Sequence, residues 1–191
     1  PNLHISGIAC HIGSQLLDPA PIAEAAQKLA ELVDRLATDG ITLDHIDLGG
    51  GLGIRYQDET PPSVADYLAP LLKVFEGRTE ELCFEPGRSL VGNAGLLLTR
   101  IEYLKPGETK NFAIVDAAMN DLARPALYDA WHEVVEVNPH AGAAVEYDIV
   151  GPLCESGDFL ARARTLAVTE GDLLAILSAG AYGMTMSSNY N

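Results

Sequence analysis

Short apolar runs alternate with stretches of helical periodicity over the first ninety residues of the chain. The runs typical of buried strands lie at 3–13, 44–51 and 81–88. Between them, apolar residues recur every three or four positions from 18 to 40 and from 63 to 77, as they do along one face of a helix. Because strands separated by helices pair in the same direction, we expect a parallel α/β arrangement over residues 1–94.

Helix end signals support these boundaries. Asp18 and Ser63 belong to the residue types that commonly cap an amino-terminal helix end, because their side-chain oxygens accept a free backbone N–H. Gly40 follows the last apolar position of the first helix, and glycine readily takes the left-handed conformation that ends helices. We therefore expect both helices to begin or end close to these residues.

Beyond about residue 95 the pattern changes to alternation of apolar and polar residues. The expected strands lie at 100–103, 111–116, 132–137, 145–150 and 173–177. Turn residues that include Pro-Gly, Asn-Pro and Gly-Pro pairs separate them. This pattern predicts an antiparallel β-domain over residues 95–191.

The composition indicates a globular protein and excludes some partners. Of 191 residues 48% are apolar, and the net charge is −15 with only 12 Lys and Arg, so we expect neither nucleic acid nor an anionic membrane surface as a partner. The chain has no apolar run of 18 or more residues and no charged-then-apolar leader, so we expect no membrane span and no secretory signal. The cysteines at 10, 83 and 154 are widely spaced, which argues against a disulfide framework or a bound metal and favours reduced thiols in a cytoplasmic protein.

Four glycines in five positions follow the second expected strand, in the stretch IDLGGGLGI at 46–54. A dinucleotide fingerprint starting at Gly49 or Gly51 would need a further glycine at 54 or 56, where Ile54 and Tyr56 stand, so the spacing excludes it. A strand that ends in residues without side chains can still present backbone N–H groups to an anion such as a phosphate.

Polar clusters follow all three strands expected in the first half: HIGSQ at 11–15, the glycines at 49–51 and EPGR at 85–88. Each has an ordinary structural explanation, as a hydrogen-bonded strand-end histidine, a tight turn, or a helix cap with a surface arginine. Carboxyl ends of parallel strands meet at one edge of a sheet, where ligands of α/β folds bind. The three clusters together therefore predict a ligand site.

The chemistry of these residues suits a phosphorylated aromatic cofactor. Ser14 and the glycine amides can donate hydrogen bonds to a phosphate, and Arg88 adds positive charge. His11 offers a flat ring, and the carboxylate of Glu85 can keep a pyridine nitrogen protonated, which strengthens an electron sink. Pyridoxal 5′-phosphate has all of these groups.

Five motifs in order resemble the alanine-racemase-like, fold type III pyridoxal-phosphate decarboxylases: HIGSQ, DLGGGLG, EPGR, GPLCESGD at 151–158 and GAYGMTMSSNYN at 180–191. The resemblance covers essentially the whole chain. It implies that residues 1–94 are the last three βα units of a TIM-type (β/α)8 barrel. It also implies that residues 95–191 form a β-sheet or β-barrel domain whose C-terminal segment returns to the active site.

The resemblance also implies roles for individual residues. For the cofactor they are His11 on the ring, Glu85 on the pyridine nitrogen, and Ser14, Gly49, Gly50, Gly51, Arg88 and Tyr182 around the phosphate. For the substrate they are Arg88, Arg124, Tyr128, Glu155 and Tyr182. Two arginines suit a substrate with two carboxylates, because a guanidinium pairs with a carboxylate through two parallel hydrogen bonds.

Cys154 and Glu155 match a pair that the family supplies from the partner subunit, which implies a homodimer with shared active sites. Together with His11 they are the expected catalytic residues, and a thiol is suited to return a proton to the substrate carbon. Outside this resemblance, Cys154 would be interpreted as a small buried side chain that fills space after a turn.

The order CESGD favours the diaminopimelate branch, whose reaction converts meso-2,6-diaminopimelate to L-lysine. The alternatives are an ornithine, arginine or carboxynorspermidine-type decarboxylase, or a silent decarboxylase-like regulator.

The lysine that binds this cofactor as a Schiff base has no counterpart in the sequence. The lysines at 28, 73, 105 and 110 fall on helix surfaces or beside a turn, and solvated surface positions explain them. In the family the Schiff-base lysine lies on an early barrel strand. We therefore expect the chain to be the later part of the enzyme and to be inactive alone.

Overall fold

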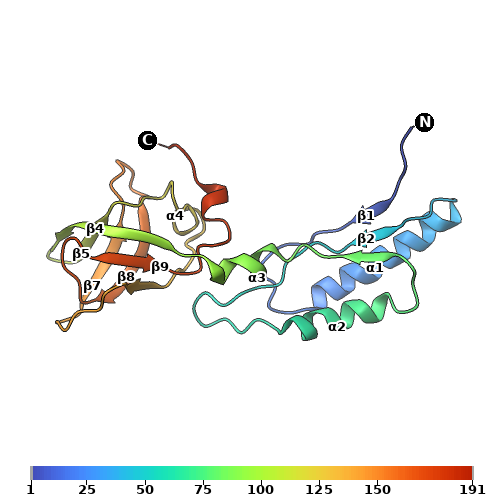
Figure 1. The fold of residues 1–191 in the computed structure, drawn as a ribbon, viewed down its shortest axis with the longest axis horizontal. Coiled ribbons are helices and arrows are strands. Elements are labelled where there is room, and N and C mark those ends of the chain that lie inside the picture. The colour runs from blue at the N-terminus through green and yellow to red at the C-terminus, as the bar shows by residue number, and fades with distance from the viewer. Residues whose placement is uncertain (1, 191) are drawn as a thin grey trace. The chain divides into compact units, whose positions relative to one another are not determined.

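The computed structural model describes residues 2–190, and the chain divides into two compact units. The N-terminal unit comprises the residues up to 55 together with 59–90, and the C-terminal unit comprises 56–58 together with the residues from 91 onward. Figure 1 colours the chain from blue in the first unit to red in the second. Each unit has its own hydrophobic core.

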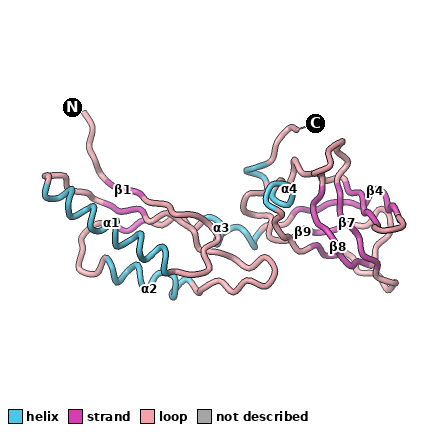
Figure 2. Tube along the Cα trace, turned by 180° about the vertical axis from the view of Figure 1, so that it is seen from behind, coloured by secondary structure: helices cyan, strands magenta, loops and turns pink. Residues whose placement is uncertain are grey.

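The N-terminal unit is a parallel sheet of three short strands with two helices. The strands are β1 (Gly7–Ala9), β2 (His45–Asp47) and β3 (Glu81–Cys83), paired in that order and all parallel. Helices α1 (Ala20–Thr38) and α2 (Val64–Val74) connect them and contact each other (Figure 2). The alternation of strand and helix in the sequence therefore predicted this unit correctly.

The strands are much shorter than the apolar runs that predicted them. The first run covers 3–13, but only Gly7–Ala9 pairs with β2. Leu3 is 92% exposed and Ile5 57% exposed, so the first apolar residues of the run belong to no core of the described chain. Backbone pairing, rather than the length of an apolar run, sets the length of a strand.

Ser63 is the N-cap of α2 as expected, whereas Asp18 lies one residue before Pro19, the N-cap of α1. Asp18 Oδ1 accepts the backbone N–H of Ala20 at 2.9 Å, and Ser63 Oγ accepts that of Asp66 at 3.1 Å. Gly40 has φ +80°, and its N–H donates to the carbonyl of Ala37 at 3.0 Å while the next amide reaches back to Leu36 at 2.9 Å. This pair of bonds is a Schellman motif, which explains why α1 stops where it does.

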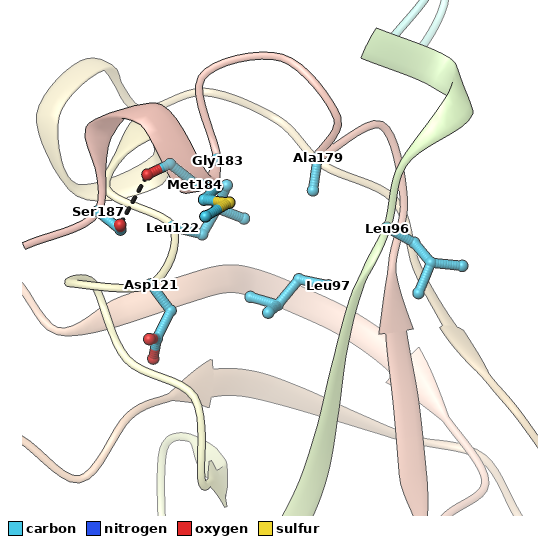
Figure 3. A pocket seen from close by; sticks show the side chains of 8 residues that line it. All are labelled: Leu96, Leu97, Asp121, Leu122, Ala179, Gly183, Met184 and Ser187. Atoms are coloured by element: carbon cyan, nitrogen blue, oxygen red, sulfur yellow. Dashed lines mark hydrogen bonds between the residues drawn. The ribbon is translucent and has the colours of Figure 1, made fainter. Parts of the chain in front are cut away.

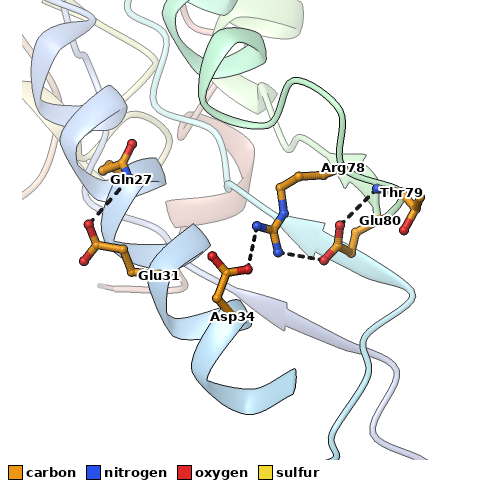
Figure 4. A network of polar contacts seen from close by, with 6 residues as sticks. All are labelled: Gln27, Glu31, Asp34, Arg78, Thr79 and Glu80. Carbon is orange, nitrogen blue, oxygen red and sulfur yellow. Dashed lines mark hydrogen bonds and ion pairs between the residues drawn. The ribbon is translucent and has the colours of Figure 1, made fainter. Parts of the chain in front are cut away.

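An arginine joins α1 to the segment that precedes β3 (Figure 4). Arg78 Nη1 lies 2.8 Å from Asp34 Oδ1 on α1, and Nη2 lies 2.9 Å from Glu80 Oε1. The hydrogen bond from Arg78 lowers the pKa of the Glu80 carboxyl. Because Arg78 and Glu80 are both well shielded from solvent, this pair has more weight than an ordinary surface ion pair.

The C-terminal unit is built around a sheet of six strands in the order β6-β9-β4-β5-β7-β8. Their bounds are β4 Leu97–Lys105, β5 Asn111–Val115, β6 Val134–Glu136, β7 Val145–Val150, β8 Phe159–Leu166 and β9 Leu173–Ile176. Its short helices are η1 (Gly92–Ala94), α4 (Arg124–Tyr128) and η2 (Met184–Met186). Helix α3 (Gly87–Val91) precedes η1, and all of it except Val91 belongs to the N-terminal unit. Ile101, Ile149 and Leu174 are among the fully buried residues of this core.

One expectation for this unit was wrong, and two of its elements were missed. Its sheet is mixed rather than antiparallel, because β5 and β7 pair in parallel while the other neighbours are antiparallel. The strand β8 and the helix α4 were not expected at all. Alternation predicts strands but not partners, so it gives no information on the direction of pairing.

The sheet curls so that its edge strands β6 and β8 approach each other. The amide of Ala167, just after β8, donates to Glu136 Oε1 of β6 at 2.6 Å, and Arg164 Nη2 donates to the carbonyl of His132 at 3.1 Å. Polar groups near both edges are thereby satisfied within the unit.

Candidate active site

The polar clusters that follow β1, β2 and β3 contact one another at one edge of the sheet. The amide of Gly50 lies 3.4 Å from His11 Nδ1, which joins the first cluster to the second. The amide of Glu85 donates to the carbonyl of Gly49 at 2.8 Å, which joins the second to the third. The sequence therefore correctly predicted that these segments meet.

Both backbone conformation and close approach require the glycines at 49–51. Gly49 has φ +66° and Gly51 φ +110°, in the region that favours glycine. A Cβ on Gly49 would lie 2.7 Å from His11 Nδ1, and one on Gly50 would collide with the carbonyl oxygen of Glu85. Any side chain at Gly49 or Gly50 would push the neighbouring clusters away.

The glycine amides are not equally available to a ligand. The N–H of Gly49 already donates to Asp47 Oδ1 at 2.7 Å. The contact of the Gly50 amide with His11 is long at 3.4 Å, so a better acceptor can replace it. An anion at this loop would therefore rely on Gly50 and Gly51 more than on Gly49.

Ser14 and Arg88 form a joint donor group beside these glycines. Arg88 Nε donates to Ser14 Oγ at 3.0 Å, although the two residues are 74 positions apart. Gln15 clamps the same loop, because its amide group donates to the carbonyl of Ile54 at 2.6 Å and accepts the N–H of Ile54 at 3.1 Å. A hydroxyl, a guanidinium and backbone amides make a donor set that fits a phosphate.

The carboxylate of Glu85 is exposed at the same edge. Within residues 2–190 its carboxylate makes no ion pair or side-chain hydrogen bond. An available carboxylate next to an imidazole ring and phosphate donors fits a protonated pyridine nitrogen.

Tyr67 supports the glycines from α2, and the sequence analysis missed it. Its hydroxyl donates to the carbonyl of Gly50 at 3.1 Å, and its side chain is only 4% exposed. Burial raises the pKa of this phenol, so it remains a neutral donor. In the sequence it is one apolar position of a helix, and only the hydroxyl hinted at a polar contact.

In the C-terminal unit a loop at 151–158 carries Cys154 and Glu155, both exposed. The buried Asp158 anchors this loop, because its carboxylate accepts the amides of Met119 and Leu153, each at 2.7 Å. Cys154 is a free, exposed thiol rather than the buried filler that a lone cysteine suggests.

The C-terminal segment lies against this loop. The hydroxyl of Tyr190 donates to Glu155 Oε2 at 3.2 Å, and the carboxylate raises the pKa of that phenol. Asn120 and Ser188 exchange two hydrogen bonds of 3.0 and 3.3 Å. The last and fourth motifs of the sequence are therefore neighbours within this unit.

A pocket of about 300 Å³ lies beside this segment (Figure 3). It is lined by Leu96, Leu97, Asp121, Leu122, Ala179, Gly183, Met184 and Ser187. Tyr182, next to the pocket in sequence, is 38% exposed and has φ +61°, which is unusual for a residue with a side chain.

Arg124 and Tyr128 lie at the two ends of α4, and Tyr128 is 65% exposed. Arg124 Nη1 is 2.9 Å from His132 Nε2, and its Cζ lies 4.7 Å from the centre of the Tyr56 ring. Neither His132 nor Tyr56 was expected near Arg124. A histidine within an apolar strand pattern is only a weak sign of a polar contact, because the pattern does not reveal which residue the histidine contacts.

None of the helices in residues 2–190 is both long and apolar enough to cross a membrane. Within the same range no three His, Cys, Asp or Glu side chains are grouped so that they could hold a metal ion.

Comparison with protein families identifies a close relationship. The family model described as pyridoxal-dependent decarboxylase, C-terminal sheet domain, matches residues 11–180. The chain belongs to the pyridoxal-dependent decarboxylases. Within this family it is 62% identical over 191 residues to the diaminopimelate decarboxylase of Pseudomonas fluorescens and 60% identical over 190 residues to that of Pseudomonas aeruginosa. Each alignment spans 100% of this chain but only 46% of the relative.

Solved structures of decarboxylases are similar to this chain as well. Diaminopimelate decarboxylase from Helicobacter pylori, complexed with L-lysine, matches with a TM-score of 0.90 and 42% identity, over 97% of this chain and 46% of that one. A lysine/ornithine decarboxylase from Vibrio vulnificus matches with a TM-score of 0.89 but only 22% identity, over 100% of this chain and 52% of that one, which shows a shared fold. The chain thus corresponds to about half of such a protein.

Proposed function

We propose that the full-length protein containing this chain converts meso-2,6-diaminopimelate to L-lysine by a pyridoxal-phosphate-dependent decarboxylation. The observation that carries this proposal is the 62% identity to a diaminopimelate decarboxylase over all 191 residues. It is supported by the contacts that join His11, Gly50 and Glu85 at the carboxyl ends of the strands. A lyase of lysine biosynthesis follows from the same proposal.

In this proposal the N-terminal unit binds the cofactor. Ser14, Arg88 and the amides of Gly50 and Gly51 hold the phosphate, with Gly49 shaping the turn. His11 would lie against the ring, Glu85 would pair with the ring nitrogen, and Tyr182 would add a phosphate contact. Bound pyridoxal phosphate supplies an electron sink for the pair of electrons left when carbon dioxide departs.

In the same proposal, arginine side chains bind the carboxylates of the substrate. Arg88 and Arg124 pair with carboxylates, and Tyr128, Glu155 and Tyr182 complete the substrate contacts. A guanidinium binds a carboxylate in a bidentate manner and repels the ammonium of a substrate that ends in an amine. This preference favours diaminopimelate over ornithine.

Cys154 is proposed to donate the proton that replaces the carboxylate on the substrate carbon. Its exposure and the rigid attachment of its loop through Asp158 support this role. We propose that Cys154 and Glu155 act in the active site of a second subunit, in a homodimer. Their thiol and carboxylate lie on the surface, where a second subunit can reach them.

The finer architecture is also a proposal. We infer that residues 1–94 are the last three βα units of a (β/α)8 barrel and that residues 95–191 form the β-domain. Three parallel strands with α1 and α2 as crossovers support the first part. We propose a cytoplasmic location, as expected from the sequence.

The test compares substrates with the purified full-length protein and pyridoxal phosphate. We expect carbon dioxide release and lysine formation from diaminopimelate, with much lower rates from ornithine and arginine. A preference for ornithine or arginine would establish the related decarboxylase instead. Borohydride reduction distinguishes a silent regulator, because a protein that fixes no cofactor on a lysine cannot be such an enzyme.

A further inference from the structure

We propose that His132 is a positioning residue that orients Arg124 toward a substrate carboxylate. This inference rests on the proposed function, because it takes Arg124 as a substrate contact. His132 is fully buried just before β6, and its two ring nitrogens contact different elements. Nε2 lies 2.9 Å from Arg124 Nη1, and Nδ1 lies 2.8 Å from the carbonyl oxygen of Leu177, just after β9.

The partners of the ring determine the direction of both hydrogen bonds. A guanidinium has five N–H donors and no acceptor, so Nε2 of His132 must accept from Arg124. A carbonyl oxygen only accepts, so Nδ1 must carry the proton and donate to Leu177. The neutral tautomer with a proton on Nδ1 satisfies both bonds, and a doubly protonated ring would place two donors face to face.

His132 is itself held in place by the core. Its backbone carbonyl accepts a hydrogen bond from Nη2 of Arg164 at 3.1 Å, and Arg164 is 7% exposed and stacked over Trp131. A hydrogen bond to Leu177 therefore fixes the ring of His132, and a hydrogen bond from Arg164 fixes its backbone. A fixed acceptor is what a long, flexible arginine needs to keep one rotamer.

Tyr56 holds the guanidinium on a second side. Arg124 Cζ lies 4.7 Å from the centre of the Tyr56 ring, and that ring meets His132 edge to face at 5.4 Å between centroids. A cation over an aromatic face is attracted to it. The ring of Tyr56 and the nitrogen of His132 together restrict the plane of the guanidinium.

The consequence concerns substrate binding. An arginine that is already oriented loses less conformational entropy when a carboxylate binds. Losing the His132 contact should raise KM for diaminopimelate and leave kcat nearly unchanged, because His132 takes no part in proton transfer. An arginine without this acceptor also discriminates less between a substrate that ends in a carboxylate and one that ends in an amine.

Two substitutions test the contributions of the two ring nitrogens of His132 separately. In His132→Asn the amide N–H can still reach Leu177, but the side chain is too short to offer Arg124 an acceptor at the Nε2 position. In His132→Gln the longer side chain can place its carbonyl oxygen near the Nε2 position and so keep that acceptor. With the full-length holoenzyme, we expect His132→Asn to raise KM about tenfold or more, since a hydrogen bond to a charged group is involved. We expect kcat to change less than about twofold, and His132→Gln to stay within about threefold of the original KM.

A double-mutant cycle with Arg124→Lys tests whether His132 acts through Arg124. We expect His132→Asn to add little to the KM of Arg124→Lys, because the contact that it removes is already gone. If Arg124→Lys raises KM but His132→Asn does not, the positioning role is wrong and the proposed function stands. If Arg124→Lys itself leaves KM unchanged, the substrate role of Arg124 in the proposed function is wrong.

Circular dichroism and thermal melting accompany both variants. If His132→Asn does not fold, His132→Gln decides alone: a KM within about threefold supports the acceptor role, and a tenfold rise with an intact fold contradicts it. Equal losses of kcat in both variants, with KM unchanged, would show a general structural role and would also overturn the proposal.

Discussion

At the scale of single residues, the glycine loop after β2 is shaped by what surrounds it as much as by what it binds. Gly50 lies against the carbonyl of Glu85, while the hydroxyl of Tyr67 holds its own carbonyl. The amide of the same residue is left with one long contact, to His11. One residue thus connects β2, β3 and α2 and still has a donor for a ligand.

Gly50→Ala should destabilise the protein and weaken binding of pyridoxal phosphate. The added methyl group collides with the backbone of Glu85, which cannot move as a side chain could, and such overpacking costs roughly 1–3 kcal/mol. Denaturant unfolding and cofactor titration of the full-length protein measure the two effects. Gly142→Ala is the matched control, because a Cβ at Gly142 meets nothing within 4 Å and the residue lies outside the candidate site. Equal losses in both variants would contradict this explanation.

Glu85→Gln should reduce turnover by on the order of 100-fold or more while leaving the fold unchanged, because the ring nitrogen would lose its anionic partner. Steady-state kinetics with diaminopimelate, together with a melting curve, check both parts. Glu108→Gln removes an exposed carboxylate elsewhere in the chain and serves as the control. Undiminished activity in Glu85→Gln would refute the role given to this carboxylate.

At the scale of elements, the helices were predicted better than the strands. A helix is made of local contacts, so its apolar period and its caps at Asp18 and Ser63 are visible in the sequence. Strand β8 was missed because its pattern is broken: Ala163 has φ +54°, and the pairing with β7 shifts register nearby. The parallel pairing of β5 with β7 depends on contacts between distant segments, which no local pattern contains.

The same distinction applies to the candidate site. Residues in the loops after β1, β2 and β3 could be predicted, because topology brings such loops together at one edge. Tyr67 and His132 could not, since each is a polar group among apolar positions, Tyr67 in α2 and His132 just before β6. Their roles depend on a specific partner, the carbonyl of Gly50 for one and the guanidinium of Arg124 for the other.

Arg78 provides a pH-dependent link between α1 and the start of β3. Because the folded-state pKa of Glu80 is lowered, this pair stabilises the fold at pH values above the usual 4.5 of a glutamate. That contribution is lost as the pH falls through the lower, folded-state pKa. We therefore expect the difference in unfolding free energy between the original protein and Arg78→Met to shrink as the pH is lowered below about 4.5.

Urea unfolding at a series of pH values measures this difference. Arg35→Met, in the last turn of α1, removes an arginine that lies outside the ion pairs of Arg78 and is the control. Asp34 is 67% exposed in its side chain, so its share of the effect is small. A difference that stays constant from neutral to acidic pH would show that Glu80 is not the group concerned.

At the scale of the whole molecule, the two units have separate cores with no residue in common. Leu71 is fully buried in the first and Ile149 in the second. Removing a large apolar side chain from a core costs about 2–5 kcal/mol, and the loss should be concentrated in the unit that contains the cavity.

Hydrogen exchange of the full-length protein tests this separation. We expect Leu71→Ala to lower protection mainly in α1, α2 and β1–β3, and Ile149→Ala mainly in β4–β9. Each variant is the control for the other. A uniform loss of protection across both units in either variant would show that they unfold as one.

The parallel pairing of β5 with β7 has a consequence for how such a protein can diverge. Parallel neighbours cannot be joined by a tight turn, so the chain needs a long crossover, and here residues 116–144 provide it. That obligatory detour holds Arg124 and His132, while the strands on either side keep their register. Under the proposed function, substrate preference can therefore change through mutation of a connecting segment that the topology requires in any case, without changes in the strands of the sheet.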